Sequence, residues 1–126
     1  MDPLLALSAY LDTLDYPAFI QDAAGRWLAA NDAFCKLMLK PRAKLLGTVP
    51  GVGEDEELPN WADWKPAFVC GGMIEVNDEF RLPDQTIQRV MTSKRVIALA
   101  DGRRVLVGEM RRSAAITSSR EDEQLF

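Results

Sequence analysis

Residues 19–33 read Phe-Ile-Gln-Asp-Ala-Ala-Gly-Arg-Trp-Leu-Ala-Ala-Asn-Asp-Ala and decide the fold of this chain. They contain most of two short apolar runs, 18–21 and 26–30, separated by a turn that includes Gly25. Glycine supplies the positive φ that a tight hairpin turn requires, so the two runs predict antiparallel strands. A polar pair follows, and Asn31 or Asp32 is expected to cap a helix, because a short polar side chain accepts hydrogen bonds from the first free N–H groups.

The second half of the chain repeats this pattern with longer strands. They are expected at 74–82, 86–99 and 103–111. These runs are rich in β-branched residues and are separated by turns, one at Pro83 and one at Gly102. Alternate residues of the middle strand offer two apolar faces, one with Met91 and one with Val90, and the sequence leaves open which face meets the core. Two hairpins in series predict a small antiparallel sheet with helices on one side, an α+β domain.

A helix is expected at the start of the chain. Asp2 is a suitable cap, Pro3 suits the first helical position, and Pro17 is expected to end the helix. Its apolar stripe consists of Leu4, Leu7, Leu11 and Leu14. The stripe fits two alternatives: packing on the sheet of the same chain, or pairing with the same helix of a second copy as a dimer interface. A stripe of about two heptads is too short to choose between them.

Large aromatic residues mark the candidate interior. Trp61, Trp64 and Phe68 recur at helical spacing and predict a helix between 60 and 70, although Pro66 weakens that prediction. Core packing is the default interpretation of such residues. The alternative is a pocket for a flat ligand between the helices and the sheet. Its candidate wall residues are Phe34, Trp64, Phe68 and Met91.

Composition excludes several classes of function. The 126 residues fit one domain, with 48% apolar and 27% charged residues, as in an ordinary soluble globule. A net charge of −4 argues against a nucleic-acid partner, and no apolar run approaches the roughly 20 residues that span a bilayer. Two cysteines are too few for a disulfide framework, so we expect a cytoplasmic location.

Histidine is absent, which removes the commonest general base and the commonest metal and haem ligand. We therefore expect neither an enzyme nor a metal site. The acidic run 54–57 is interpreted as a solvated loop rather than a cation site.

The pattern as a whole resembles a PAS domain over residues 11–112. The matching residues are Phe19-Ile20-x-Asp22-x-x-Gly25-Arg26, Leu28-x-x-Asn31-x-Ala33-Phe34, Leu45-Leu46-Gly47, Gly71, Glu79-Phe80-Arg81-Leu82-Pro83-Asp84, Thr92-Ser93-Lys94, Asp101-Gly102-Arg103 and Val107-Gly108. The resemblance implies a five-stranded antiparallel sheet in the order 2-1-5-4-3 with short helices over one face. The chain then divides into a flanking helix at 1–15, the PAS-like domain at 16–112, and a linker or the start of a signalling helix at 113–126.

The resemblance also implies a function. Such domains are sensory and interaction modules of larger signalling proteins, in two-component or cyclic-dinucleotide pathways, and relay ligand or partner binding through flanking helices. The expected partners are a second copy, a downstream effector domain and a small hydrophobic ligand; the alternative is a ligand-free dimerisation scaffold that binds only protein. A flavin–cysteine adduct is argued against, because Asn31 is followed by Asp32-Ala33-Phe34 rather than by the cysteine motif of light sensors. Histidine-ligated haem is argued against as well.

Overall fold

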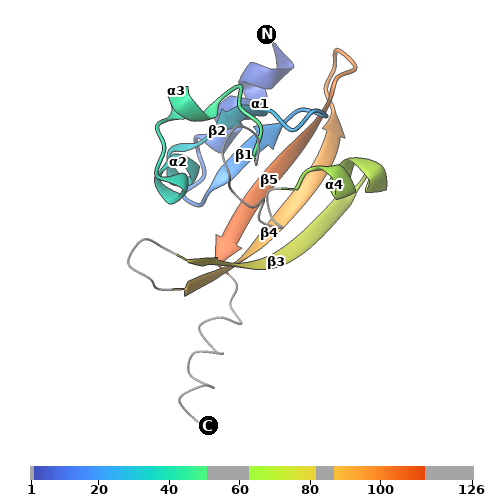
Figure 1. The fold of residues 1–126 in the computed structure, drawn as a ribbon. Coiled ribbons are helices and arrows are strands. Elements are labelled where there is room, and N and C mark those ends of the chain that lie inside the picture. The colour runs from blue at the N-terminus through green and yellow to red at the C-terminus, as the bar shows by residue number, and fades with distance from the viewer. Residues whose placement is uncertain (1, 51–62, 82–86, 113–126) are drawn as a thin grey trace.

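The computed structural model describes residues 2–50, 63–81 and 87–112 (Figure 1). Its elements are α1 (Pro3–Leu11), β1 (Ala18–Gln21), β2 (Trp27–Ala30), α2 (Asp32–Met38), α3 (Arg42–Leu45), α4 (Lys65–Cys70), β3 (Met73–Arg81), β4 (Ile87–Ala98) and β5 (Arg104–Arg112). The strands form one sheet of order β2-β1-β5-β4-β3 in which every neighbouring pair is antiparallel. The predicted architecture and strand order are therefore confirmed.

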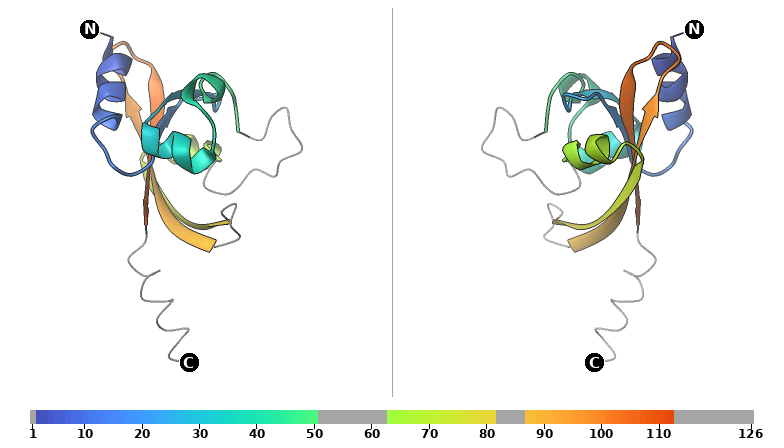
Figure 2. Two further views of the ribbon diagram at one scale, coloured as in Figure 1. Left: turned by 90° about the vertical axis from the view of Figure 1, so that its left-hand side faces the viewer. Right: turned by 90° about the vertical axis from the view of Figure 1, so that its right-hand side faces the viewer.

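The sheet is covered on both faces (Figure 2). Helices α2, α3 and α4 lie on one face, which we call the inner face, and α1 lies on the other, the outer face. The core cluster of the inner face consists of Phe19, Trp27, Ala30, Phe34, Leu45, Ala67, Val90, Leu106 and Met110. The cluster of the outer face consists of Leu11, Ala18, Ile20, Ala29, Leu99, Val105 and Val107.

The middle strand of the meander settles the question that its sequence left open. Val90, Thr92 and Lys94 of β4 are all buried. Because successive side chains of a strand point to opposite faces, Met91 lies on the outer side of the sheet, opposite Arg111 of β5. The face with Val90 therefore meets the inner cluster, whereas Ile97 on the opposite face packs against the outer cluster.

Both predicted glycine turns are present. Gly25 has a φ of 88°, and its N–H donates to the carbonyl of Asp22 at 3.0 Å. Gly102 has a φ of 91°, and its N–H donates to the carbonyl of Leu99 at 2.9 Å. These left-handed conformations close the first and last hairpins. The two hairpins join where β1 pairs with β5, a contact between distant parts of the chain.

The first helix ends earlier than the sequence predicts. It stops at Leu11, six residues before Pro17, because a tight turn follows in which the Thr13 hydroxyl and N–H both donate to the carbonyl of Tyr10. Leu14 therefore lies beyond the helix. Leu11 is nevertheless buried, and the other three leucines of the predicted stripe pack against the outer cluster around it. The stripe thus packs on the sheet of its own chain, the first of the two alternatives, whereas dimer formation stays a prediction.

The helix expected at 60–70 is shorter, because α4 begins only at Lys65. Pro66 lies in its first turn, where the missing N–H of proline has no helical partner to lose, so the residue expected to weaken the helix helps to start it. Several other predictions lie outside the described residues: the acidic run 54–57, Trp61, the turn at Pro83 and the segment 113–126.

Candidate functional site

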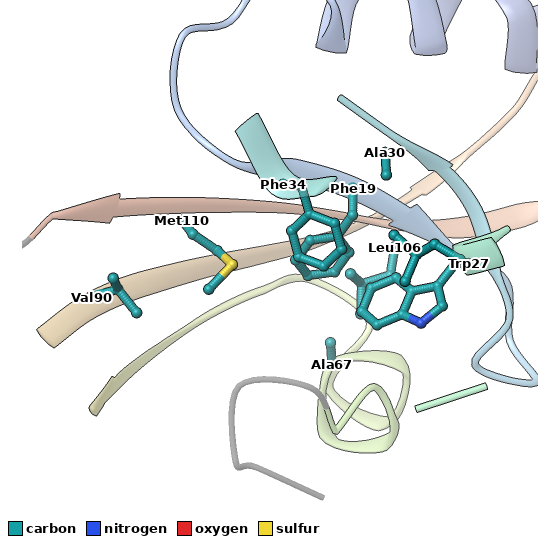
Figure 3. Packing of buried hydrophobic residues seen from close by; sticks show 9 residues of the cluster. Phe19, Trp27, Ala30, Phe34, Ala67, Val90, Leu106 and Met110 are labelled. Atoms are coloured by element: carbon teal, nitrogen blue, oxygen red, sulfur yellow. The ribbon is translucent and has the colours of Figure 1, made fainter. Parts of the chain in front are cut away.

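The inner face is built on three aromatic rings in mutual contact (Figure 3). Phe19 of β1 meets the ring of Trp27 edge-on, with centroids 4.9 Å apart. Phe34 of α2 lies 5.0 Å from Phe19 and 5.1 Å from Trp27. Asn31 positions Phe34 at the start of α2. The Asn31 side chain accepts a hydrogen bond from the Phe34 N–H at 3.0 Å and so caps the helix as predicted. Phe34 is fully buried and belongs to the core cluster.

The other predicted wall residues divide between the two faces. Trp64 and Phe68 are half-buried and pack against the inner cluster. The Trp64 ring lies directly over Gly25, where a Cβ atom would be 2.5 Å from its Cε2. Met91 lies on the outer face, so the structure does not bring it together with the other three. The alternation of strand residues is the physical reason, since Thr92 occupies the inward position.

Three buried polar side chains interrupt the otherwise apolar inner face. Gln21 of β1, Thr92 of β4 and Lys94 of β4 are each fully buried. The amide nitrogen of Gln21 donates to the carbonyl of Gly25 at 3.1 Å, and the Lys94 ammonium donates to the carbonyl of Asp63. Within the described residues, the Gln21 Oε1 and Thr92 Oγ1 atoms are buried without a hydrogen-bond partner.

Leaving a buried oxygen unpaired costs about 1–3 kcal/mol, and such groups in native proteins call for a physical explanation. The Gln21 oxygen can only accept a hydrogen bond, whereas the Thr92 hydroxyl can both donate and accept. The register of the sheet separates them, because Gln21 lies level with Val96 of β4 and Thr92 lies four residues away along that strand. Each oxygen could therefore orient a different polar group of a small molecule whose apolar part lies against the aromatic rings.

Sequence reasoning missed this polar set for an identifiable reason. Gln21 ends an apolar run, where a polar residue usually marks the start of a turn. Thr92 and Lys94 lie on a strand whose inward face the sequence left open. Their spacing of two residues was a usable signal, because it places both side chains on the same face as Val90.

A second polar network connects the segment after α1 to the end of β5. The Tyr16 hydroxyl donates to Oε1 of Glu109 at 2.6 Å and accepts from Nη2 of Arg111 at 3.1 Å. The Arg111 guanidinium also lies 4.9 Å from the centroid of the Tyr16 ring. Strand alternation puts Glu109 and Arg111 on the outer face, opposite the buried Met110. The network therefore joins the N-terminal flank to the last described strand.

This network shifts the ionisation of its members. The pKa of Tyr16 is raised, chiefly because its hydroxyl donates to Glu109 and also because burial disfavours the charged phenolate. The pKa of Arg111 is raised by its hydrogen bond to Tyr16. A raised pKa in the folded state stabilises the fold fully below the unfolded tyrosine pKa of about 10, and this contribution is lost as the pH rises through the folded value.

We expect Glu109→Gln to lower the pKa of Tyr16 toward its ordinary value, because the substitution replaces the charged acceptor of the hydroxyl's hydrogen bond by a weaker neutral one and removes the negative charge that opposes ionisation. Alkaline titration of tyrosinate absorbance measures this in a Tyr10→Phe background, where Tyr16 is the remaining tyrosine. Glu75→Gln, at an exposed position on β3, is the control and should leave the titration unchanged. Coincident curves for Glu109→Gln and its parent would contradict the assignment of this network.

The described residues contain no cluster of three or more histidine, cysteine or carboxylate side chains that could hold a metal ion. Among the same residues, no helix combines the length and the apolar character that crossing a bilayer requires. Cys35 and Cys70 are both free thiols.

Solved structures, several of them of PAS domains, match the chain over most of its length. The PAS domain of BvgS from Bordetella pertussis is 14% identical, with 99% of this chain and 100% of that chain covered and a TM-score of 0.65. A PAS domain of a two-component sensor histidine kinase is 18% identical, with coverage of 87% and 96% and a TM-score of 0.62. The structure of VqmA bound to DPO is 16% identical, with coverage of 87% and 57% and a TM-score of 0.67.

No family model matches the sequence, and no curated protein does. The structural matches show the fold: this chain has the fold of a PAS domain. Among the matching structures are modules of signalling proteins, such as the sensor histidine kinase.

Proposed function

We propose that this chain is a sensory and protein-interaction module of a larger signalling protein, in which a small ligand binds at the inner face of the sheet and flanking segments relay the binding. The observation that carries this proposal is the pair of unpartnered buried oxygens, Gln21 Oε1 and Thr92 Oγ1. Each oxygen would bind a polar group of such a ligand separately, because Gln21 lies level with Val96 of β4 and Thr92 lies four residues away along that strand. The bound DPO in the VqmA structure supports a ligand-binding role for a protein that shares this fold.

The relay would work by population shift. A ligand that prefers one arrangement of the flanking segments shifts the equilibrium by its difference in affinity for the two arrangements, and about 1.4 kcal/mol changes the ratio tenfold. The Tyr16 network supplies a physical connection, because it joins the segment after α1 to β5. Beyond β5 we propose a downstream effector domain, in a two-component or cyclic-dinucleotide pathway of the cytoplasm.

We expect Thr92→Val to raise the unfolding free energy of the ligand-free protein by about 1 kcal/mol, because a methyl group of similar size replaces a hydroxyl that is buried and unpaired. Denaturant titration measures the change. Ser93→Ala is the matched control, since it removes a hydroxyl from the neighbouring outward position and should change stability by less than about 0.5 kcal/mol. A Thr92→Val protein less stable than its parent would show that the hydroxyl already has a partner.

Native mass spectrometry of protein purified without added ligand tests the sensory role itself. A reproducible additional mass on the parent protein that decreases in Thr92→Val supports the proposal. A parent protein that carries no additional mass, and whose melting temperature a library of small polar aromatics leaves unchanged, would favour the second candidate.

That second candidate is a dimerisation scaffold that binds only protein. The observation in its favour is the exposed side of α1, where Leu5 is 64% and Tyr10 48% exposed. Since the leucine stripe packs on its own sheet, a homodimer through α1 would use this side of the helix instead. Light scattering checks it directly: a monomeric mass at high micromolar concentration contradicts a homodimer.

A further inference from the structure

The corner between α2 and α3 holds the only non-glycine residue with a positive φ in the described part of the chain. Leu39 has a φ of 57° and a ψ of 36°, in the left-handed helical region. It ends α2 with two backbone bonds: its own N–H donates to the carbonyl of Lys36, and the N–H of Lys40 donates to the carbonyl of Cys35, each at 3.2 Å. This is the Schellman arrangement, in which glycine usually occupies the left-handed position.

Leucine at this position is unfavourable for the isolated fold. A residue with a Cβ atom is strained in the left-handed region, where glycine is not. Burial of the side chain could offset that strain, but Leu39 is 69% exposed. The molecule therefore holds an apolar side chain in solvent on a strained turn, and neither feature benefits its own core.

Basic side chains surround this corner. Residues 32–44 contain four basic residues and one acidic residue, a net charge of +3 in a chain whose net charge is −4. The acidic residue, Asp32, is paired with Arg42 at 2.9 Å. Lys36, Lys40 and Lys44 are exposed, and no described carboxylate lies within ion-pair distance of them. Figure 1 shows α2 and α3 as neighbours; Lys36 belongs to α2, Lys44 to α3, and Lys40 to the short connection between them.

We propose that this corner, Leu39 with Lys36, Lys40 and Lys44, is a docking surface for an acidic protein segment that carries an apolar anchor residue. Charge complementarity identifies the partner: three ammonium groups without an ion pair among the described residues attract carboxylates, and the exposed Leu39, next to Lys40 in the sequence, supplies the apolar contact. The four residues of this surface are exposed and belong to α2, α3 and their connection, whereas the two buried oxygens belong to strands β1 and β4. The inference is therefore independent of the proposed ligand.

A protein segment fits better than an anionic membrane. One exposed leucine is a small apolar area, and membrane attachment needs either a large apolar face or several basic groups on a surface without opposing charge. The remainder of this chain is negatively charged and would be repelled by anionic lipid. An acidic peptide can contact the corner without approaching the rest of the molecule.

The test uses the full chain and a fluorescent twelve-residue peptide in which glutamates flank a central pair of leucines. Fluorescence anisotropy should show saturable binding that weakens as salt is raised from about 0.02 M to about 0.15 M, where the screening length is near 8 Å. Leu39→Gly and Lys40→Glu should each weaken binding at least about tenfold, as substitutions at the centre of an interface do. Arg95→Glu makes the same charge change on the outer face and should alter binding less than twofold.

Leu39→Gly also separates loss of binding from loss of folding, because this variant is expected to be more stable than the parent protein. Removing the strained Cβ should raise the melting temperature by about 3–5 °C, so loss of binding in this variant cannot be attributed to unfolding. Three results would overturn the proposal: no saturable binding of the peptide by the parent protein, equal binding by Leu39→Gly, or binding to vesicles rich in phosphatidylserine in preference to the peptide. The last result would assign the corner to membranes.

Discussion

Replacing Gly108 by alanine is expected to lower the unfolding free energy by about 3 kcal/mol, because the core has no space for the added methyl group. A Cβ atom at Gly108 would lie 2.1 Å from Cζ of Phe19 and within 2.6 Å of both Cε atoms. Phe19 cannot withdraw, since it is fully buried and packs against Trp27 and Phe34. We expect the melting temperature to fall by about 10 °C, measured by thermal denaturation.

Gly72→Ala is the matched control for this prediction. Gly72 lacks a positive φ, and the nearest atom to an added Cβ is the Cys70 sulfur at 4.0 Å, so we expect a change below about 0.5 kcal/mol. A second test combines Gly108→Ala with Phe19→Leu, which makes space at the ring. The double variant should lose less stability than the sum of the two single changes, because the two sites are in contact. Strict additivity would show that the clash is relieved elsewhere.

Asn31→Ala is expected to destabilise the protein by a similar amount, about 3 kcal/mol, because one buried side chain makes four hydrogen bonds. Its Oδ1 accepts from the N–H groups of Ala18 and Phe34, each at 3.0 Å. Its Nδ2 donates to the carbonyls of Leu11 and Tyr16 at 3.1 Å and 2.8 Å. Truncation removes a helix cap and leaves buried backbone groups of three separate segments without this partner. Denaturant titration measures the loss.

Asp32→Ala tests whether the stability loss at Asn31 depends on its buried hydrogen bonds or would follow from removing any short polar side chain there. Asp32 is the neighbouring short polar residue, but its carboxylate is exposed, and its ion-pair partner in the described part of the chain is the exposed Arg42. Surface ion pairs contribute little, so we expect a loss below about 1 kcal/mol. If Asn31→Ala proved no more destabilising than Asp32→Ala, the four-bond description of Asn31 would be wrong.

The comparison of these two residues shows what the sequence could predict. Either Asn31 or Asp32 was expected to cap α2, since capping depends on local backbone geometry and a short polar side chain. The structure selects Asn31, because the carbonyls of Leu11 and Tyr16 lie beside its amide nitrogen. Those carbonyls are 20 and 15 residues away along the chain, so no local pattern contains them.

The candidate site was less accessible to prediction than the fold. Phe34, Trp64 and Phe68 were identified as aromatic residues of the interior, and the structure places all three at the inner face. Met91 was assigned to the same group, and strand alternation turns it to the outer face. The two unpartnered oxygens could not be anticipated, because burial of Gln21 and Thr92 depends on which elements cover the sheet.

The strained corner at Leu39 is a further feature that the sequence could not predict. In the sequence, Leu39 follows the apolar residues Leu37 and Met38 and precedes Lys40, and no glycine marks the end of the helix there. Only the backbone geometry reveals the left-handed conformation, and only the packing reveals that the side chain remains in solvent.

Local rules acting on the amino-acid sequence were sufficient to determine the antiparallel hairpins, the glycine turns and the α+β class of this protein, because hydrophobic alternation and positive φ act over a few residues. Tertiary structure alone decided which face of β4 is buried, where α1 packs, and which polar atoms lie unpaired inside. Those outcomes depend on contacts between segments that are distant in the chain. The free energy of such contacts cannot be inferred from any single stretch of sequence.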